Sequence, residues 1–225
     1  MKRLVLWDID HTLISTRGVG RELSATAFEA TTGQKMRKQA KIDGITEPVI
    51  FRETAKLHGI DTDRTDFEAF ACHLAKAHHE RADELRDRGH ALPGAVEALD
   101  AFAALPGVVQ TVVSGNVRTV AEIKLQIFGL DRHIRWDVGA YGEDDDERAE
   151  LVHLALQRAS VAPTHAILIG DTPADVAAAR DNAVRVIAVA TGRSDEAELR
   201  ATGSDVVLPN LLDIDLHTKL LTEQR

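Results

Sequence analysis

The sequence predicts an α/β protein with a doubly wound parallel sheet, into which an all-helical domain is inserted. Short, continuous apolar runs begin near residues 4, 108 and 166, and such runs are typical of strands buried on both faces. Amphipathic helical patterns separate the later runs, and this alternation indicates a parallel sheet. Between the first two runs lies a long stretch with helical periodicity only. Because an ordinary crossover needs far fewer residues, we interpret this stretch as an insertion.

The first strand is the apolar run Leu4–Trp7, which leads directly into Asp8, Ile9 and Asp10. Side chains alternate along a strand, so both carboxylates should leave it on one side while Ile9 turns back to the core. Two such carboxylates repel each other. The pair is stable only if a cation bridges it or if one member keeps its proton.

The helical stretch that follows is predicted to form a domain of its own, residues 15–89. The remainder, residues 1–14 and 90–225, is predicted to form the parallel-sheet core. Three helices are expected in the insertion, around residues 23–30, 49–57 and 67–77. Gly59 is a candidate C-terminal cap of the second helix, and Asp63 or Thr65 is a candidate N-cap of the third.

The core resumes near Pro93-Gly94 with alternating elements. Pro173 suits the first position of a helix that has Thr172 as its N-cap. The expected strands are residues 108–113, 136–138, 166–169, 184–189 and 206–208, and the expected helices are residues 94–105, 117–128, 148–159 and 173–180.

Composition excludes several classes of protein. A formal net charge of -9 and only 4% aromatic residues argue against nucleic-acid binding. The single cysteine, Cys72, cannot form an internal disulfide. The first apolar run ends at Asp8, which is too short for a signal peptide, and no run is long enough to span a membrane. We therefore expect a soluble, cytoplasmic protein that does not bind membranes. The sequence does not indicate its oligomeric state.

Polar side chains collect where three of the predicted strands end. In an open parallel sheet, ligands bind beyond the carboxyl ends of the strands, so the three clusters should meet in one crevice. Helix N-termini there favour an anion, and carboxylates favour a hard divalent cation, a combination that fits a phosphoryl group with Mg²⁺. The clusters are Asp8/Asp10/Thr12, Ser114/Gly115/Asn116 and Gly170/Asp171/Thr172/Asp175.

These motifs resemble the signature of the haloacid dehalogenase-like (HAD) hydrolases. The matching segments are Asp8-x-Asp10-x-Thr12, Ser114-Gly115-Asn116 and Gly170-Asp171-x-x-x-Asp175. The chain is most similar to phosphoglycolate phosphatase-like members, which have a Rossmann-like core and a helical cap inserted after the first strand.

The resemblance implies a role for each residue. Asp8 would attack phosphorus, and Asp10 would protonate the leaving oxygen and later take a proton from water. A neighbouring carboxylate would raise the pKa of Asp10 for this task. Mg²⁺ would be held by Asp8, the backbone carbonyl of Asp10 and Asp171, with Asp175 supporting the metal shell. Thr12, Ser114, Gly115 and Asn116 would form the phosphate site.

The family's basic residue is harder to place, because the usual Lys-Pro segment is absent. The corresponding segment reads Asp146-Glu147-Arg148-Ala149-Glu150. We choose Arg148, which precedes the last acidic strand by one helix. Lys124 is the alternative, although a position well inside a helix would also suit a plain surface charge.

Other candidates lie in the insertion. His73, His78 and His79 have metal-like spacing, but without a carboxylate partner we interpret them as a solvated helix face. Arg17, Lys41, Gly44 and Thr46 are placed to reach a substrate from the cap.

The sequence thus predicts a Mg²⁺-dependent phosphatase acting on a small phosphorylated metabolite through an aspartyl-phosphate. A phosphomutase of the β-phosphoglucomutase type is the alternative within enzymes. A receiver-like phosphoacceptor module is the alternative from another class. The substrate cannot be named from the sequence, because cap residues set it.

Overall fold

The structure of the protein, a computed structural model, describes residues 2–213. Residues 214–225, which belong to the predicted core, lie outside this range. The strands are β1 (Arg3–Trp7), β2 (Ile14–Ser15), β3 (His90–Ala91), β4 (Val108–Val112), β5 (Ala166–Gly170), β6 (Arg185–Val189) and β7 (Val206–Leu208). The helices are α1 (Val19–Thr32), α2 (Glu47–Lys56), α3 (Arg64–Glu80), α4 (Ala82–Arg88), α5 (Ala95–Ala103), α6 (Arg118–Ile127), α7 (Arg148–Ala159), α8 (Pro173–Asp181) and α9 (Glu196–Ala201).

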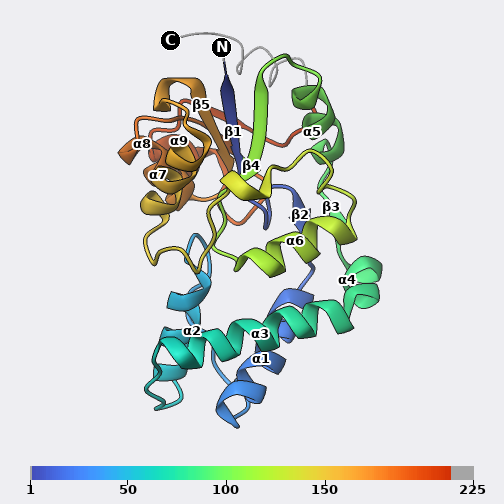
Figure 1. The fold of residues 1–225 in the computed structure, drawn as a ribbon, viewed down its shortest axis with the longest axis vertical. Coiled ribbons are helices and arrows are strands. Elements are labelled where there is room, and N and C mark those ends of the chain that lie inside the picture. The colour runs from blue at the N-terminus through green and yellow to red at the C-terminus, as the bar shows by residue number, and fades with distance from the viewer. Residues whose placement is uncertain (1, 214–225) are drawn as a thin grey trace.

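The core of the fold is a five-stranded sheet in the order β4-β1-β5-β6-β7. Every pairing in it is parallel, which confirms the predicted α/β class. Strand β1 lies between β4 and β5 (Figure 1). The next strand of this sheet along the chain, β4, is added on one side of β1, and the later strands are added on the other side. Such a switch point opens a crevice at the carboxyl end of the strands.

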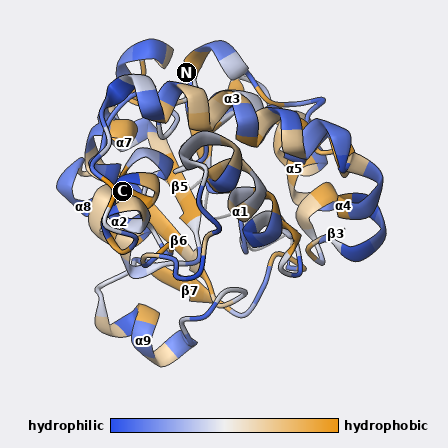
Figure 2. Ribbon diagram, turned by 90° about the horizontal axis from the view of Figure 1, so that it is seen from below, coloured by the Kyte–Doolittle hydropathy of each residue, from blue (hydrophilic) through white to orange (hydrophobic). Residues whose placement is uncertain are grey.

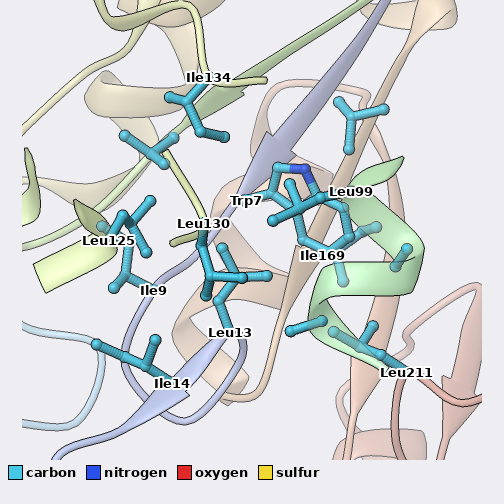
Figure 3. Packing of buried hydrophobic residues seen from close by; sticks show 14 of the residues in the cluster. Trp7, Ile9, Leu13, Ile14, Leu99, Leu125, Leu130, Ile134, Ile169 and Leu211 are labelled. Atoms are coloured by element: carbon cyan, nitrogen blue, oxygen red, sulfur yellow. The ribbon is translucent and has the colours of Figure 1, made fainter. Parts of the chain in front are cut away.

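The alternation of side chains along β1 divides the apolar core between the two faces of the sheet. Val5 and Trp7 pack with residues of α5 and α6 in one cluster, part of which Figure 3 shows. Leu4 and Leu6 pack on the other face with residues of α7 and α8. Buried on both faces, β1 has the geometry that its continuous apolar run predicts.

Helices α1–α4 form the predicted helical cap, on the opposite side of α6 from the sheet in Figure 1. Its interior is an aromatic cluster that includes Phe28, Phe51, Phe67 and Phe70. Seen from below (Figure 2), the apolar colour is concentrated on the strands, and the surrounding helices carry many hydrophilic residues. The cap helices therefore bury an apolar cluster separate from the two clusters of the sheet, and Val117 and Val120 pack into it from the core.

The two crossings between core and cap are close together, because β2 pairs antiparallel with β3. The boundaries that we predict, at residues 14/15 and 89/90, fall at this pair and stay a prediction.

One predicted strand is wrong. Trp136–Val138 is a 3₁₀ helix, in which the Val138 amide donates to the Arg135 carbonyl at 3.4 Å. Beside the edge of β4, the described chain pairs as isolated bridges at Ile134 and Ala140 and not as a strand. The residues between these two bridges therefore include the 3₁₀ helix and do not extend the sheet. Among the described residues, no helix is long and apolar enough to cross a membrane.

The segment before α2 lies so close to the core that a side chain on Gly115 has no room. A Cβ there would lie 2.5 Å from the Ile45 carbonyl oxygen, and the Glu47 amide already donates to the Gly115 carbonyl at 2.8 Å. We expect Gly115→Ala to lower the free energy of unfolding by about 1–3 kcal/mol in urea titrations, because the loops must separate. Gly20→Ala, inside α1, is the control, since the nearest atom to its Cβ would be a flexible Thr16 hydroxyl at 3.3 Å. Equal stability of the two variants would contradict the close approach.

Candidate active site

The site begins where β1 ends. The Asp8 amide donates to the Ile169 carbonyl at 2.9 Å, so the backbone of Asp8 is held against β5. The chain then turns sharply through His11, whose φ is 65°, and both Thr12 and Leu13 donate back to the Ile9 carbonyl. Ile9 is fully buried, as predicted, while the side chains of Asp8 and Asp10 line a cavity.

Three aspartates meet at this edge of the sheet. Within the described part of the chain, Asp8, Asp171 and Asp175 are the acidic group close enough to hold a metal ion, with one carboxylate oxygen from each within 4.8 Å of the others. Asp171 follows β5. Asp175 lies in the first turn of α8, where it forms a capping box with Thr172.

The hydroxyl of Thr12 contacts two of these carboxylates. It donates to Asp171 at 3.2 Å and approaches Asp8 at 3.4 Å. Thr12 is fully buried and is not part of the cavity wall. The structure thus places it as a support for the carboxylates, whereas we expected it among the phosphate-binding residues.

Electrostatics at the three aspartates fit a bound cation. Burial raises the pKa of Asp8, and neighbouring Asp175 and Asp10 raise it further. Burial also raises the pKa of Asp171, as do the charges of Asp8 and Asp175. A divalent cation stabilises the ionised form of carboxylates whose pKa is raised in this way. Oxygen ligands are also those that Mg²⁺ prefers. The donor set therefore fits a hard metal ion.

Arg148, the first residue of α7, holds two of these carboxylates. Its Nη2 donates to Asp8 at 2.6 Å, and its Nε donates to Asp175 at 2.8 Å. Burial opposes the charge of Arg148, but the charges of Asp175 and Asp8 raise its pKa. The predicted basic residue thus reaches the predicted nucleophile directly.

Lys124 is also part of the site, and the interpretation of it as a surface charge is wrong. It is only 5% exposed. Its Nζ donates to both carboxylate oxygens of Asp10, at 2.9 and 2.7 Å, and to Oδ1 of Asn116 at 2.7 Å. Val120 and Lys124 lie four residues apart, on one face of α6, and both line the cavity.

This pairing reverses the expected pKa shift of Asp10. Burial raises the pKa, but the charge of Lys124 and hydrogen bonds from Asn116 and Lys124 outweigh it, so the pKa is lowered. We expected Asp8 to raise it. A cation in direct contact acts more strongly than a carboxylate farther away.

Ser114 and Asn116 occupy the end of β4. The Asn116 side-chain amide donates to Asp10 and to the Ser114 hydroxyl oxygen, both at 2.8 Å. The Asn116 backbone amide also approaches that oxygen, at 3.2 Å. Because these contacts use the Ser114 oxygen as an acceptor, its hydrogen is free to donate elsewhere.

The cavity between core and cap has a volume of about 170 Å³, smaller than the roughly 300–1,000 Å³ of sites for drug-sized ligands. Most of the predicted site residues line it, namely Asp8, Asp10, Ser114, Gly115, Asn116, Arg148, Asp171 and Asp175. Among the predicted cap residues, Gly44 lines it, whereas Arg17 and Lys41 are exposed and do not. Thr46 is buried and donates to the Asp146 carbonyl at 3.1 Å.

The cap contributes residues that sequence reasoning missed. Ser24 of α1, Glu47 of α2 and His78 of α3 all line the cavity. The interpretation of the histidines as a solvated face is wrong for His78, which is 2% exposed. Its position four residues after buried Leu74 is a helical-spacing signal that could have found it. Burial raises the pKa of Glu47 to about 7.

Comparisons with known proteins establish the family. The family model described as haloacid dehalogenase-like hydrolase matches residues 5–180, and a second, described as HAD-hydrolase-like, matches residues 148–214. The chain therefore belongs to the haloacid dehalogenase-like hydrolases and is an enzyme of this phosphatase family.

Individual relatives are distant. The chain is 25% identical over 188 residues to a protein named Putative pyrophosphatase PpaX from Caldanaerobacter subterraneus, covering 82% of this chain and 80% of that one. A hydrolase from Pseudomonas syringae has a similar fold, with a TM-score of 0.71 at 18% identity over 99% of this chain and 100% of that one. So does a protein described as a predicted phosphoglycolate phosphatase from Haemophilus somnus, with a TM-score of 0.65 at 15% identity over 96% and 98% of the two chains.

Burial of neutral His78 predicts a pH-dependent stability. Burial lowers its pKa from 6.5 to about 4. Between these values the unfolded chain binds more protons than the folded one, so stability is present above pH 6.5 and is lost as the pH falls toward 4. From about pH 7 to about pH 4.5, we expect the unfolding free energy of the wild type to fall by about 2–3 kcal/mol more than that of His78→Phe in urea titrations. Exposed His79→Phe should behave like the wild type. Parallel losses in the wild type and His78→Phe would contradict a buried, neutral imidazole.

Proposed function

We propose that the protein is a Mg²⁺-dependent phosphatase that hydrolyses a small phosphomonoester through a phosphorylated Asp8. The observation that carries this proposal is the position of Asp8, which contacts the Arg148 guanidinium at 2.6 Å and lies in the group of three aspartates. A carboxylate in this position can approach a phosphoryl group, because the Arg148 guanidinium and a bound metal ion would offset the negative charge of that group.

Asp8, Asp171 and Asp175 would hold the Mg²⁺, together with the backbone carbonyl of Asp10. When bound, the ion would neutralise part of the charge on the carboxylates and on the transferring phosphoryl group. Arg148 would keep the nucleophilic oxygen of Asp8 oriented. It would also reduce the repulsion between that oxygen and an incoming phosphate.

Asp10 would exchange protons with the leaving oxygen and then with water. Lys124 and Asn116 keep its carboxylate ionised in the free protein, which suits the step in which it takes a proton from water. A dianionic phosphate bound next to Asp10 would raise its pKa by repulsion between like charges. The same side chain can then supply a proton in the first step.

The phosphoryl oxygens would be held at the end of β4. The Ser114 hydroxyl has its hydrogen available, and Gly115, whose backbone amide would donate, lines the cavity. The side chain of Asn116 is already bound to Asp10 and Lys124, so it would act by positioning those two groups. The size of the cavity supports a small phosphorylated metabolite.

The nucleophile assignment predicts the effect of one substitution. With Mg²⁺ and a generic aryl phosphate, Asp8→Asn should lower kcat on the order of 10⁴-fold or more, because an amide cannot form the acyl phosphate. Chelation of Mg²⁺ by EDTA should abolish wild-type turnover, and added Mg²⁺ should restore it. Exposed Asp61→Asn serves as the control and should retain activity. Turnover by Asp8→Asn would exclude the covalent route, and activity in EDTA would exclude the metal.

The two buried cations should differ in their effects. Arg148→Ala leaves Asp8 and Asp175 uncompensated, so we expect a loss of about 3–5 kcal/mol in unfolding free energy without Mg²⁺, and the larger loss in kcat. Lys124→Ala removes the cation that lowers the pKa of Asp10, so the acid limb of the kcat profile should move to higher pH. Urea titrations and pH–rate profiles of both variants measure these effects. A larger kcat loss in Lys124→Ala would make Lys124 the charge-neutralising residue.

A phosphomutase remains the alternative, because it would use Asp8 and Asp10 in the same way. Release of inorganic phosphate from the phosphorylated protein separates the two, since a mutase transfers the group to a second hydroxyl. The receiver-like alternative is disfavoured by the helical cap, whose residues close one side of the cavity.

A further inference from the structure

His78 carries a buried atom that has nothing to bind. Among the described residues, its Nε2 is the buried side-chain nitrogen or oxygen that lacks a hydrogen-bond partner. Buried polar atoms are nearly always paired in native proteins, so each exception calls for a physical reason. The ring lines the cavity that contains Asp8 and Asp10. Nε2 itself is covered by neighbouring atoms, so a ligand in that cavity pairs with it after a small shift of the ring or its neighbours.

The contacts of the ring define what kind of partner it needs. Nδ1 lies 2.9 Å from the carbonyl oxygen of Leu74, and because a carbonyl only accepts, Nδ1 must carry the hydrogen. Burial lowers the pKa of His78 to about 4, so the ring is neutral near pH 7. Nε2 therefore presents a lone pair on the side of the ring away from the Leu74 carbonyl. It requires a hydrogen-bond donor.

The nearest cation does not meet this need. Lys124 lies close enough for its charge to lower the pKa of His78. Its Nζ, however, already donates to the two oxygens of Asp10 and to Asn116. An ammonium group has three hydrogens, so these acceptors use all of them. The charge of Lys124 also disfavours a second cation at this place, so a neutral donor suits it better.

The neighbouring cap residues also disfavour a carboxylate at this end of the cavity. Glu47 also lines the cavity, and the charge of Lys124 acts on Glu47 as it does on His78. A carboxylate there would meet the lone pair of His78, which repels it, and Glu47, which repels it whenever that carboxyl group is ionised. Arg21 lines the cavity too, but it is exposed on α1 and can balance a carboxylate only toward solvent.

We propose that Nε2 of His78 accepts a hydrogen bond from a hydroxyl on the alcohol part of the substrate. His78 is then a specificity residue that selects phosphomonoesters of polyols or sugars over phosphorylated carboxylic acids and over esters without a second hydroxyl. This inference rests on the proposed phosphatase function. A site with an unpaired acceptor rejects an analogue that lacks the matching donor, because the acceptor stays buried and unpaired.

The test compares matched phosphate esters that differ in one group. Monophosphates of propane-1,3-diol and of propanol differ only in the distal hydroxyl, and phosphoglycolate supplies a carboxylate. For the wild type we expect kcat/KM for the diol ester to exceed that for the propyl ester by about 10²-fold, and also to exceed that for phosphoglycolate. A diol-to-propyl ratio near one, or preference for phosphoglycolate, would overturn the proposal.

Variants assign the effect to the ring. His78→Phe should collapse the diol-to-propyl ratio toward one, whereas His78→Gln, whose amide oxygen can accept, should retain part of it. Exposed His79→Phe is the matched control and should leave the ratio and the activity unchanged. An unchanged ratio in folded His78→Phe would overturn the proposal. If that variant fails to fold, the ¹⁵N resonance of His78 Nε2 in Asp8→Asn decides instead. It should shift on addition of the diol ester and not of the propyl ester, and equal shifts would overturn the proposal.

The outcome also separates this inference from the function on which it rests. If the wild type hydrolyses no phosphomonoester, a generic aryl phosphate included, the phosphatase proposal fails first. If it hydrolyses the aryl phosphate but does not distinguish the diol ester from the propyl ester, only the role of His78 fails.

Discussion

The crowding of carboxylates at the end of β1 is the constraint on which the rest of the site depends. If Asp8, Asp10, Asp171 and Asp175 were all ionised, the two cations in contact with them, Arg148 and Lys124, would leave two negative charges uncompensated. Buried charges are stable only when they are paired. A single divalent cation would supply the missing positive charge. The raised pKa values of Asp8 and Asp171 show that the two basic residues alone do not.

The two cations reach the carboxylates from two different helices. Arg148 is the first residue of α7 and lies 8% exposed between Asp8 and Asp175. Lys124 projects from the last turn of α6, a helix that also packs Val120 against the cap. Arg148 thus contacts Asp8, the candidate nucleophile, and Lys124 contacts Asp10. Because the two carboxylates have different partners, their pKa values move in opposite directions, and such divergence is how paired acids acquire separate roles.

Features with a local cause were predictable from the sequence. Helix α7 (Arg148–Ala159) and strand β7 (Val206–Leu208) have the predicted bounds, since periodicity and apolar runs are local patterns. The Thr172 cap and its proline are equally local. A contact between distant residues was predicted where the family resemblance supplied it, as for Arg148 and Asp8, whereas the contact of Lys124 with Asp10 was missed. Lys124 is separated from Asp10 by 114 residues, and nothing in the periodicity of α6 reveals that contact. The isolated bridges near Trp136 also depend on residues distant in sequence, because they form against the edge of β4.

The charge of Lys124 acts on residues of both the core and the cap. In the proposed function, the residues that choose the substrate and those that act at phosphorus are therefore coupled through Lys124. The charge of Lys124 lowers the pKa of Asp10 in the core and also acts on Glu47 and His78 in the cap. Its hydrogens are all directed at the core, so the cap feels only its charge. In the proposed phosphatase, a neutral imidazole, a carboxyl group and an ammonium group whose hydrogens are all used would face the alcohol part of a phosphate ester bound at Asp8. The chemistry at phosphorus is common to every substrate, whereas only an alcohol that offers a hydrogen to His78 completes the pairing of buried groups that the folded chain leaves unfinished.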